Sequence, residues 1–231
     1  MKKVVMIVSA GMMMAAGSVL AGGSASLDLA SAYVFRGVTF NDGLVLQPGV
    51  KVAEYGVTLG AWGNLDLDDY AGAVAENQFS EIDLYGSYAL PVEAADISVG
   101  YTEYTYPGAE GEADREVSLS IGLKVLASPS VAVYYGVDGG IDKTLYIEGA
   151  VGHELELGEG IGLKLGATVG YVDPDGGTSG FSHFTAKAGL SYACLAASVT
   201  YIGQIDEEVL PDGAGAYDAE VVGVIGVSGD L

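Results

Sequence analysis

The chain has 231 residues, half of them hydrophobic, and its 31 acidic residues against nine basic ones give a formal net charge of −22. This negative charge excludes electrostatic binding to nucleic acid, because such binding needs Lys and Arg to neutralise phosphates. With a single cysteine, Cys194, the chain cannot form an intramolecular disulfide. No linker rich in Pro or Ser divides it, so we expect one domain after the N-terminal segment.

The N-terminal segment has the features of a secretory signal peptide. Two lysines follow Met1, an apolar run extends from Val4 to Leu20, and small residues follow it. We expect residues 1–21 to be the signal peptide, with cleavage after residue 25 as the alternative, and residues 26–231 to form the mature domain. Loss of the two lysines moves the formal charge to −24.

The stretch from Leu27 to Val52 alternates between apolar and polar residues, which is typical of strands with one apolar face. The pattern predicts one long strand through Phe35. Asn41, Asp42 and Gly43 tolerate turn conformations, and alternation resumes from Leu44. The sequence therefore predicts a hairpin of two long strands.

Four segments, in order along the chain, resemble the TorF family of porins, a bacterial group of uncharacterised function. They are S-A-Y-V-F-R-G-V-T (31–39), G-V-T-L-G-A-W-G-N (56–64), E-I-D-L-Y-G-S-Y (81–88), and V-G-Y followed by Y-T-Y-P-G (99–108). The resemblance covers nearly the whole mature chain. It implies a β-barrel in the bacterial outer membrane and supplies no catalytic residues.

Alternating segments continue to the C-terminus. They are residues 55–65, 79–90, 95–106, 115–126, 131–138, 143–153, 161–172, 182–193, 195–205 and 217–227. With the first hairpin they make about twelve strands, an even number of the length that tilted outer-membrane strands need. After the signal peptide no apolar run reaches the roughly 18–20 residues of a spanning helix. We therefore predict an all-β fold, a transmembrane antiparallel up-and-down β-barrel.

The links between strands alternate in length. Even links are short, at residues 53–54, 91–94, 127–130, 154–160 and around Cys194. Most odd links are longer and acidic, at 66–78, 107–114, 173–181 and 206–216, whereas the first (39–42) and the fourth odd link (139–142) are short. Long loops of one parity indicate that the odd links face outward and that both termini are periplasmic.

Charged residues decide which face of the strands points inward. Lys124, Lys164 and Lys187 all lie on the polar parity, and a lysine facing lipid near the midplane costs about 2–4 kcal/mol. We therefore expect the polar face to line the lumen. The candidate lumen-lining residues are Arg36, Lys51, Glu81, Asp83, Glu116, Lys124, Glu148, Lys164 and Lys187.

Aromatic residues fall into two groups. Those at strand ends, including Tyr33, Phe35, Tyr101 and Tyr192, are expected in the two interfacial girdles or in packing. Others lie on the lumen parity and would narrow a pore: Trp62, Tyr85, Tyr134 and Tyr146.

These features predict a porin-like channel for passive diffusion of small polar solutes or ions, with a preference for cations because carboxylates are in excess. The alternative is a closed structural or surface-binding barrel whose lumen charges brace the wall. The expected partners are outer-membrane lipid and the solutes, not nucleic acid, and the barrel could be monomeric or a homo-oligomer.

We expect no enzymatic activity and no cofactor. There is no Gly-x-Ser-x-Gly motif, and Ser182 and His183 are adjacent rather than spaced as in a catalytic triad, so we expect His183 in the lumen or at its rim. The acidic runs at 66–69, 173–175 and 206–208 lack the full spacing of a Ca²⁺ loop, which leaves solvated loops as the simpler interpretation.

Overall fold

A computed structural model describes residues 22–69, 76–108, 112–213 and 215–231 of the chain. Residues 1–21 lie outside it, so the signal peptide stays a prediction, and parts of the second and third odd links (70–75 and 109–111) also lie outside. The described residues contain strands and one short 3₁₀ helix, η1 (Gly139–Ile141). Among them, no helix has the length and apolar character needed to cross a membrane.

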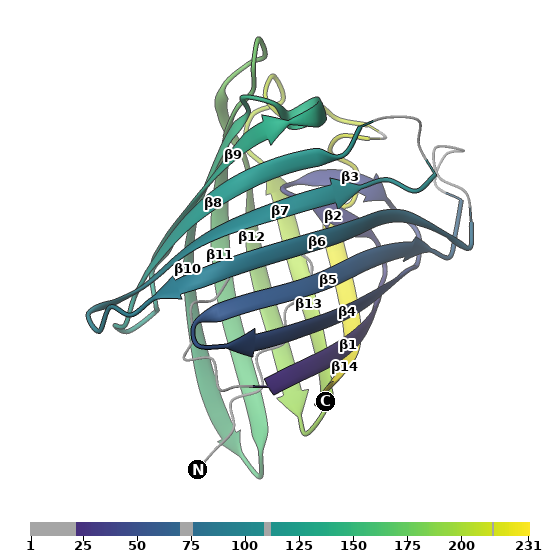
Figure 1. The fold of residues 1–231 in the computed structure, drawn as a ribbon. Coiled ribbons are helices and arrows are strands. Elements are labelled where there is room, and N and C mark those ends of the chain that lie inside the picture. Colours follow the sequence, from purple (N-terminus) through teal and green to yellow (C-terminus); the bar gives the residue numbers. More distant parts are fainter. Residues whose placement is uncertain (1–21, 70–75, 109–111, 214) are drawn as a thin grey trace.

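Twelve strands close into a single antiparallel barrel (Figure 1). They are β1 (Gly22–Ala30), β4 (Val45–Glu54), β5 (Val57–Asp66), β6 (Gln78–Leu90), β7 (Ala95–Thr105), β8 (Asp114–Leu123), β9 (Ser130–Asp138), β10 (Leu145–Gly158), β11 (Ile161–Asp173), β12 (Gly180–Tyr192), β13 (Leu195–Gln204) and β14 (Val221–Asp230). Each strand pairs with its neighbours along the chain, and β1 closes the ring between β14 and β4. The predicted fold class and strand number are confirmed.

The two faces of the strands differ as the sequence pattern predicts. In β8, the apolar residues Val117, Leu119 and Ile121 are each more than 40% exposed on the outside, whereas Glu116 is 2% exposed. The other strands repeat this arrangement, with most of the large apolar side chains of β4 to β14 exposed on the outer face. A closed barrel with this outer surface satisfies all its backbone groups in lipid, because it has no free edge.

The links at the two ends of the barrel also differ. At the end that carries the C-terminus and the start of β1, the links are tight (Figure 1). Tyr55 and Gly56, for example, join β4 to β5 with φ angles of 51° and 82°, the conformation of a two-residue hairpin turn. The longer links, including 205–220 between β13 and β14, gather at the opposite end.

The first link corrects the sequence-based prediction. The long strand predicted through Phe35 is wrong, because β1 ends at Ala30 and the link to β4, residues 31–44, turns away from the wall after Ser31, whose N–H still donates to the carbonyl of Gly223. Within this link, β2 (Tyr33–Phe35) and β3 (Val38–Asn41) form a separate two-stranded sheet. We call residues 33–41 the inner hairpin. The first odd link was predicted to be short, and it is in fact one of the longest.

Candidate functional site: a hairpin across the lumen

The turn of the inner hairpin consists of Arg36 and Gly37. Their φ angles are 52° and 85°, and Phe35 pairs with Val38, which is the geometry of a two-residue turn with two left-handed residues. Asn, Asp and Gly are the usual residues there. The left-handed conformation costs an arginine about 1–2 kcal/mol, so contacts made by its side chain have to offset this strain.

Those contacts begin with Glu116 of β8. Both terminal nitrogens of Arg36 donate to this carboxylate, Nη1 to Oε2 at 3.0 Å and Nη2 to Oε1 at 2.9 Å. The hydroxyl of Tyr104 on β7 donates to the same Oε1 at 2.7 Å. Because the pair is bidentate and its carboxylate is buried, it fixes the position and the orientation of the hairpin tip.

Three aromatic rings surround the Arg36 guanidinium. Its central carbon lies 4.6 Å from the ring centroid of Phe35, 4.3 Å from that of Tyr134 and 4.4 Å from that of Tyr146. Tyr134 and Tyr146 belong to β9 and β10, so the tip is held by three consecutive wall strands. Each stacked ring adds about 0.5–2 kcal/mol to the binding of a partly desolvated cation.

Gly37 lies directly against β12. A Cβ atom at this position would be 2.7 Å from Cγ of His183, so only glycine fits both the turn and the contact. His183 is almost fully buried and stacks parallel to Tyr146, and the hydroxyl of Ser182 lies 3.0 Å from its Nδ1. His183 therefore lies in the lumen, beneath the hairpin turn.

The far side of the hairpin is bonded to the link between β13 and β14. The Thr39 hydroxyl, fully buried, accepts hydrogen bonds from the backbone N–H groups of Asp218 and Ala219 at 3.1 and 3.0 Å. The Thr39 N–H donates to the carbonyl of Ala216 at 2.6 Å. The inner hairpin is thus fixed at its tip and at its side, and it is not a freely moving loop.

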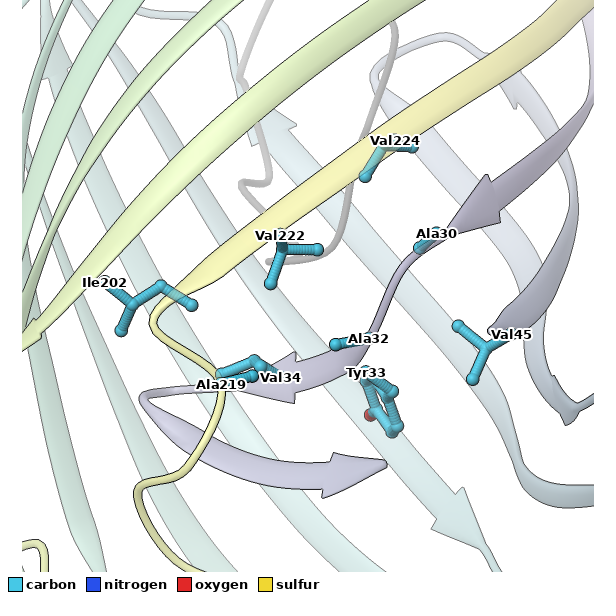
Figure 2. Packing of buried hydrophobic residues seen from close by; sticks show 9 residues of the cluster. All are labelled: Ala30, Ala32, Tyr33, Val34, Val45, Ile202, Ala219, Val222 and Val224. Atoms are coloured by element: carbon cyan, nitrogen blue, oxygen red, sulfur yellow. The ribbon is translucent and has the colours of Figure 1, made fainter. Parts of the chain in front are cut away.

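The first strand of the hairpin packs on the inner wall. Tyr33 and Val34 belong to a buried cluster with residues of β13, β14 and the start of β4, as Figure 2 shows. The members of the cluster are Ala30, Ala32, Tyr33, Val34, Val45, Ile202, Ala219, Val222 and Val224. Of the two expectations for Tyr33, packing holds and the interfacial girdle does not, because this ring is 3% exposed and lies inside the barrel. Phe35 also turns inward, against Tyr104.

Tyr33 also contacts an acidic residue of β6. Its hydroxyl donates to Glu81 Oε2 at 2.8 Å, and its ring packs against Trp62 at a centroid distance of 5.5 Å. Glu81 and Asp83 are 4% and 3% exposed, and Asp83 Oδ1 has no hydrogen-bond partner among the described residues. These two carboxylates are buried inside the barrel, but neither lines the cavity described below.

Between the inner hairpin and the end of the barrel that carries the chain termini lies a cavity of about 640 Å³. It is lined by six of the nine candidate residues: Arg36, Glu116, Lys124, Glu148, Lys164 and Lys187. Glu81 and Asp83 lie outside the cavity lining, and so does Lys51, which is half-buried on β4. With Asp28 and Asp96, the lining carries four acidic and four basic side chains.

Two of the cavity lysines have acidic partners. Lys124 Nζ lies 3.1 Å from Asp96 Oδ1 and Lys164 Nζ lies 3.7 Å from Glu154 Oε1. Lys187 forms no hydrogen bond or ion pair with any residue that the structure describes, although the charge of Asp28 on β1 acts on it. The lumen is therefore polar, but not all of its charged side chains are paired.

Sequence reasoning missed Tyr33, Gly37 and Thr39 as residues of this site. All three lie on a segment whose alternation continues that of β1, so periodicity could not separate them. A signal was present in Gly37, because an isolated glycine within a strand pattern suggests a bulge or a close approach of the backbone to another element.

No group of three or more His, Cys, Asp or Glu residues that could hold a metal ion occurs within the described ranges.

Above the hairpin, the hydroxyl of Tyr106 donates to Asp114 Oδ2 at 2.8 Å. Burial, together with the nearby charges of Glu81 and Asp114, raises the pKa of Tyr106, so this hydroxyl stays a neutral donor.

The closed twelve-strand barrel, its apolar outer face and the inward-folded first loop define the class as a porin-like β-barrel of the outer-membrane type. The chain belongs to a family described as "Bacterial protein of unknown function (Gcw_chp)", whose model matches residues 15–221. No curated protein matches the sequence.

Solved structures show the same fold at low sequence identity. The NanC porin in a rhombohedral crystal form is 10% identical, with 90% of this chain and 100% of that chain covered and a TM-score of 0.56. A structure from work on the in-meso crystallization of membrane proteins is also 10% identical, with 91% and 84% covered and a TM-score of 0.50. The comparisons therefore support a bacterial family and a porin-like barrel, whereas the resemblance to the TorF family stays a prediction.

Proposed function

We propose that the protein is a narrow porin of the TorF type in the bacterial outer membrane, through which small polar solutes and ions diffuse passively. The observation that carries this proposal is the inner hairpin, which crosses a polar lumen and reduces its bore without filling it. A lumen-facing cavity of about 640 Å³ remains beside the hairpin, and a mainly structural barrel of this size would gain stability by filling it with side chains.

The proposed orientation places the chain termini in the periplasm and the longer loops outside. The loops are acidic: Asp142, Asp173, Asp175 and residues 206–208 lie at that end of the barrel. Because the cavity lining carries equal numbers of acidic and basic side chains, the proposed cation preference rests on this outer mouth. An acidic mouth concentrates cations where they enter, so the preference should weaken as salt screens it.

The proposal includes no catalytic residue. Ser182 and His183 are within hydrogen-bond distance, but both are buried beneath the hairpin, and the hydroxyl of Ser182 lies near the carbonyl of Gly170. No carboxylate is bonded to His183 among the described residues, as a nucleophilic triad would need.

The second candidate is a closed barrel with a structural or surface-binding role. It is favoured by the fixation of the hairpin at both sides, through Glu116 and through Thr39. In this case the loops at the outer end would carry the function and the lumen would conduct no ions.

Recording in planar bilayers separates the two candidates. Protein refolded in detergent and inserted into a neutral bilayer is placed in a KCl gradient. The proposal predicts small, stable conductance steps and a reversal potential that shows cation preference, decreasing at high salt. A preference for anions would contradict the role of the acidic mouth, and the absence of conductance would favour the closed barrel.

A further inference from the structure

Two lysines lie side by side on the inner wall, in the half of the lumen nearer the chain termini. The register pairs Lys164 of β11 with Gly189 of β12, and Gly166 of β11 with Lys187 of β12. The lysines are therefore diagonal neighbours on the same face, roughly 7–8 Å apart at their backbones. Each lysine pairs with a glycine, so neither lies directly opposite a side chain of the other strand.

This arrangement is unfavourable unless something compensates it. Two ammonium groups on adjacent strands repel each other, and they are close enough here to interact. Lys164 has one distant partner, Glu154 at 3.7 Å, and Lys187 has none within the part of the chain that the structure describes. The pair therefore retains unmatched positive charge at the edge of an open cavity.

The surroundings of the pair suit a small oxyanion. The cavity next to the lysines is lined by hydroxyl-bearing side chains, Thr168, Thr185, Ser191 and Ser198. Thr168 and Thr185 share a hydrogen bond of 2.8 Å, which leaves acceptor and donor capacity directed to the cavity. Small residues on this wall, including the cavity-lining glycines at 166 and 189, leave room for a ligand instead of a side chain.

We propose that Lys164 and Lys187 form a binding site for the carboxylate or phosphate group of a small solute. Asp28, which lines the same cavity and lies within electrostatic range of Lys187, opposes the binding of an anion. The site does not depend on the proposed function, because an anion can bind in this half of the lumen whether or not solutes pass the hairpin.

The test measures binding without transport. Refolded protein in an uncharged maltoside detergent is titrated with inorganic phosphate, and in a second arm with acetate, by isothermal calorimetry and by ³¹P NMR line broadening for phosphate. We expect saturable binding that is weakened about tenfold or more in Lys164→Gln and Lys187→Gln, since each removes a charge-assisted hydrogen bond. Binding of phosphate alone would identify the ligand group as a phosphate, and binding of both anions would show that the site also accepts a carboxylate.

Two further variants make the result specific. Asp28→Asn should bind phosphate more tightly, because it removes the opposing charge, whereas Lys187→Arg should retain binding. Lys143→Ala, in the loop between β9 and β10, removes the same charge far from the cavity and should leave the affinity unchanged. Heat-modifiable migration on a gel establishes that each variant is folded. Equal affinities in the native protein and in the folded Lys164→Gln and Lys187→Gln variants, or no saturable binding to the native protein, would overturn the proposal.

Discussion

Arg36, at the tip of the inner hairpin, forms a bidentate ion pair with Glu116, which lies 80 residues further along the chain on the opposite wall of the lumen. This pair connects the first loop to β8 and so determines how far the hairpin reaches across the barrel. The predictions below follow from this connection and from the contacts that support it.

Arg36→Ala should release the hairpin tip. The substitution leaves Glu116 buried without its partner, which costs about 3–5 kcal/mol in comparable pairs and favours a displaced hairpin. We expect a larger and noisier single-channel conductance and a lower unfolding temperature. Arg115→Ala is the matched control: Arg115 is adjacent to Glu116 but bonds to Glu103 and Asp138 at the outer rim. Equal conductance in Arg36→Ala and in the native protein would show that the tip does not limit the bore.

Gly37→Val should displace the hairpin for a steric reason. Its first side-chain carbon would meet His183 at 2.7 Å, and φ is +85°, so both the contact and the turn are lost. Gly176→Val is the control, because Gly176 has a φ of +78° with no atom within 4 Å. Both variants carry the backbone cost of about 1–2 kcal/mol. Only Gly37→Val should displace the hairpin and so make the peptide bond after Arg36 accessible to limited trypsin cleavage. Identical cleavage of the two variants would contradict the close contact with β12.

Thr39→Val tests the attachment of the hairpin to the link between β13 and β14. Valine has nearly the same shape as threonine but lacks the hydroxyl that accepts a hydrogen bond from the buried Ala219 N–H. Loss of this acceptor should lower the free energy of unfolding by about 1–3 kcal/mol. Denaturant titration in detergent measures this loss. Thr178→Val, in an exposed loop, is the control and should change the stability little. If both variants are equally stable, the Thr39 hydrogen bonds do not hold the hairpin.

Leu119→Arg tests the orientation of the strands in lipid. Leu119 lies on the outer face near the middle of β8, where an arginine costs about 2–4 kcal/mol in a bilayer. Leu157→Arg, near the end of β10, should cost about 0–1 kcal/mol because the interface tolerates charge. Folding yields in vesicles should fall for the first variant only. A similar yield for both would contradict the assignment of the outer face to lipid.

The sequence was sufficient to predict the barrel wall. Period-2 alternation with charged residues on one face required an enclosed lumen, and Glu116, Lys164 and Lys187 do line the cavity. The inner hairpin could not be predicted in this way, because Tyr33 and Phe35 continue the apolar parity of Leu27 and Leu29. Alternation shows that one face of a segment is apolar, but it does not show whether this apolar face contacts lipid or packs inside the barrel.

The positions of Glu81 and Asp83 show a second limit. Their parity predicts that both face inward, and both are buried inside, but neither lines the cavity, and Glu81 accepts a hydrogen bond from the Tyr33 hydroxyl. That relationship depends on where a loop of another part of the chain folds. A tertiary contact of this kind leaves no periodic signal in β6 itself.

The most direct test of the account is the conductance of a barrel without its inner hairpin. Ala30 and Val45 are paired, so residues 31–44 can be replaced by the two-residue turn Asn-Gly without changing the register of β1 and β4. Replacing residues 173–179, which lie between the paired Val172 and Gly180, in the same way is the control. The account predicts small conductance steps for the native protein and the control, and steps several-fold larger for the variant without the hairpin. Equal steps in all three proteins, or no conductance when the hairpin is removed, would contradict it.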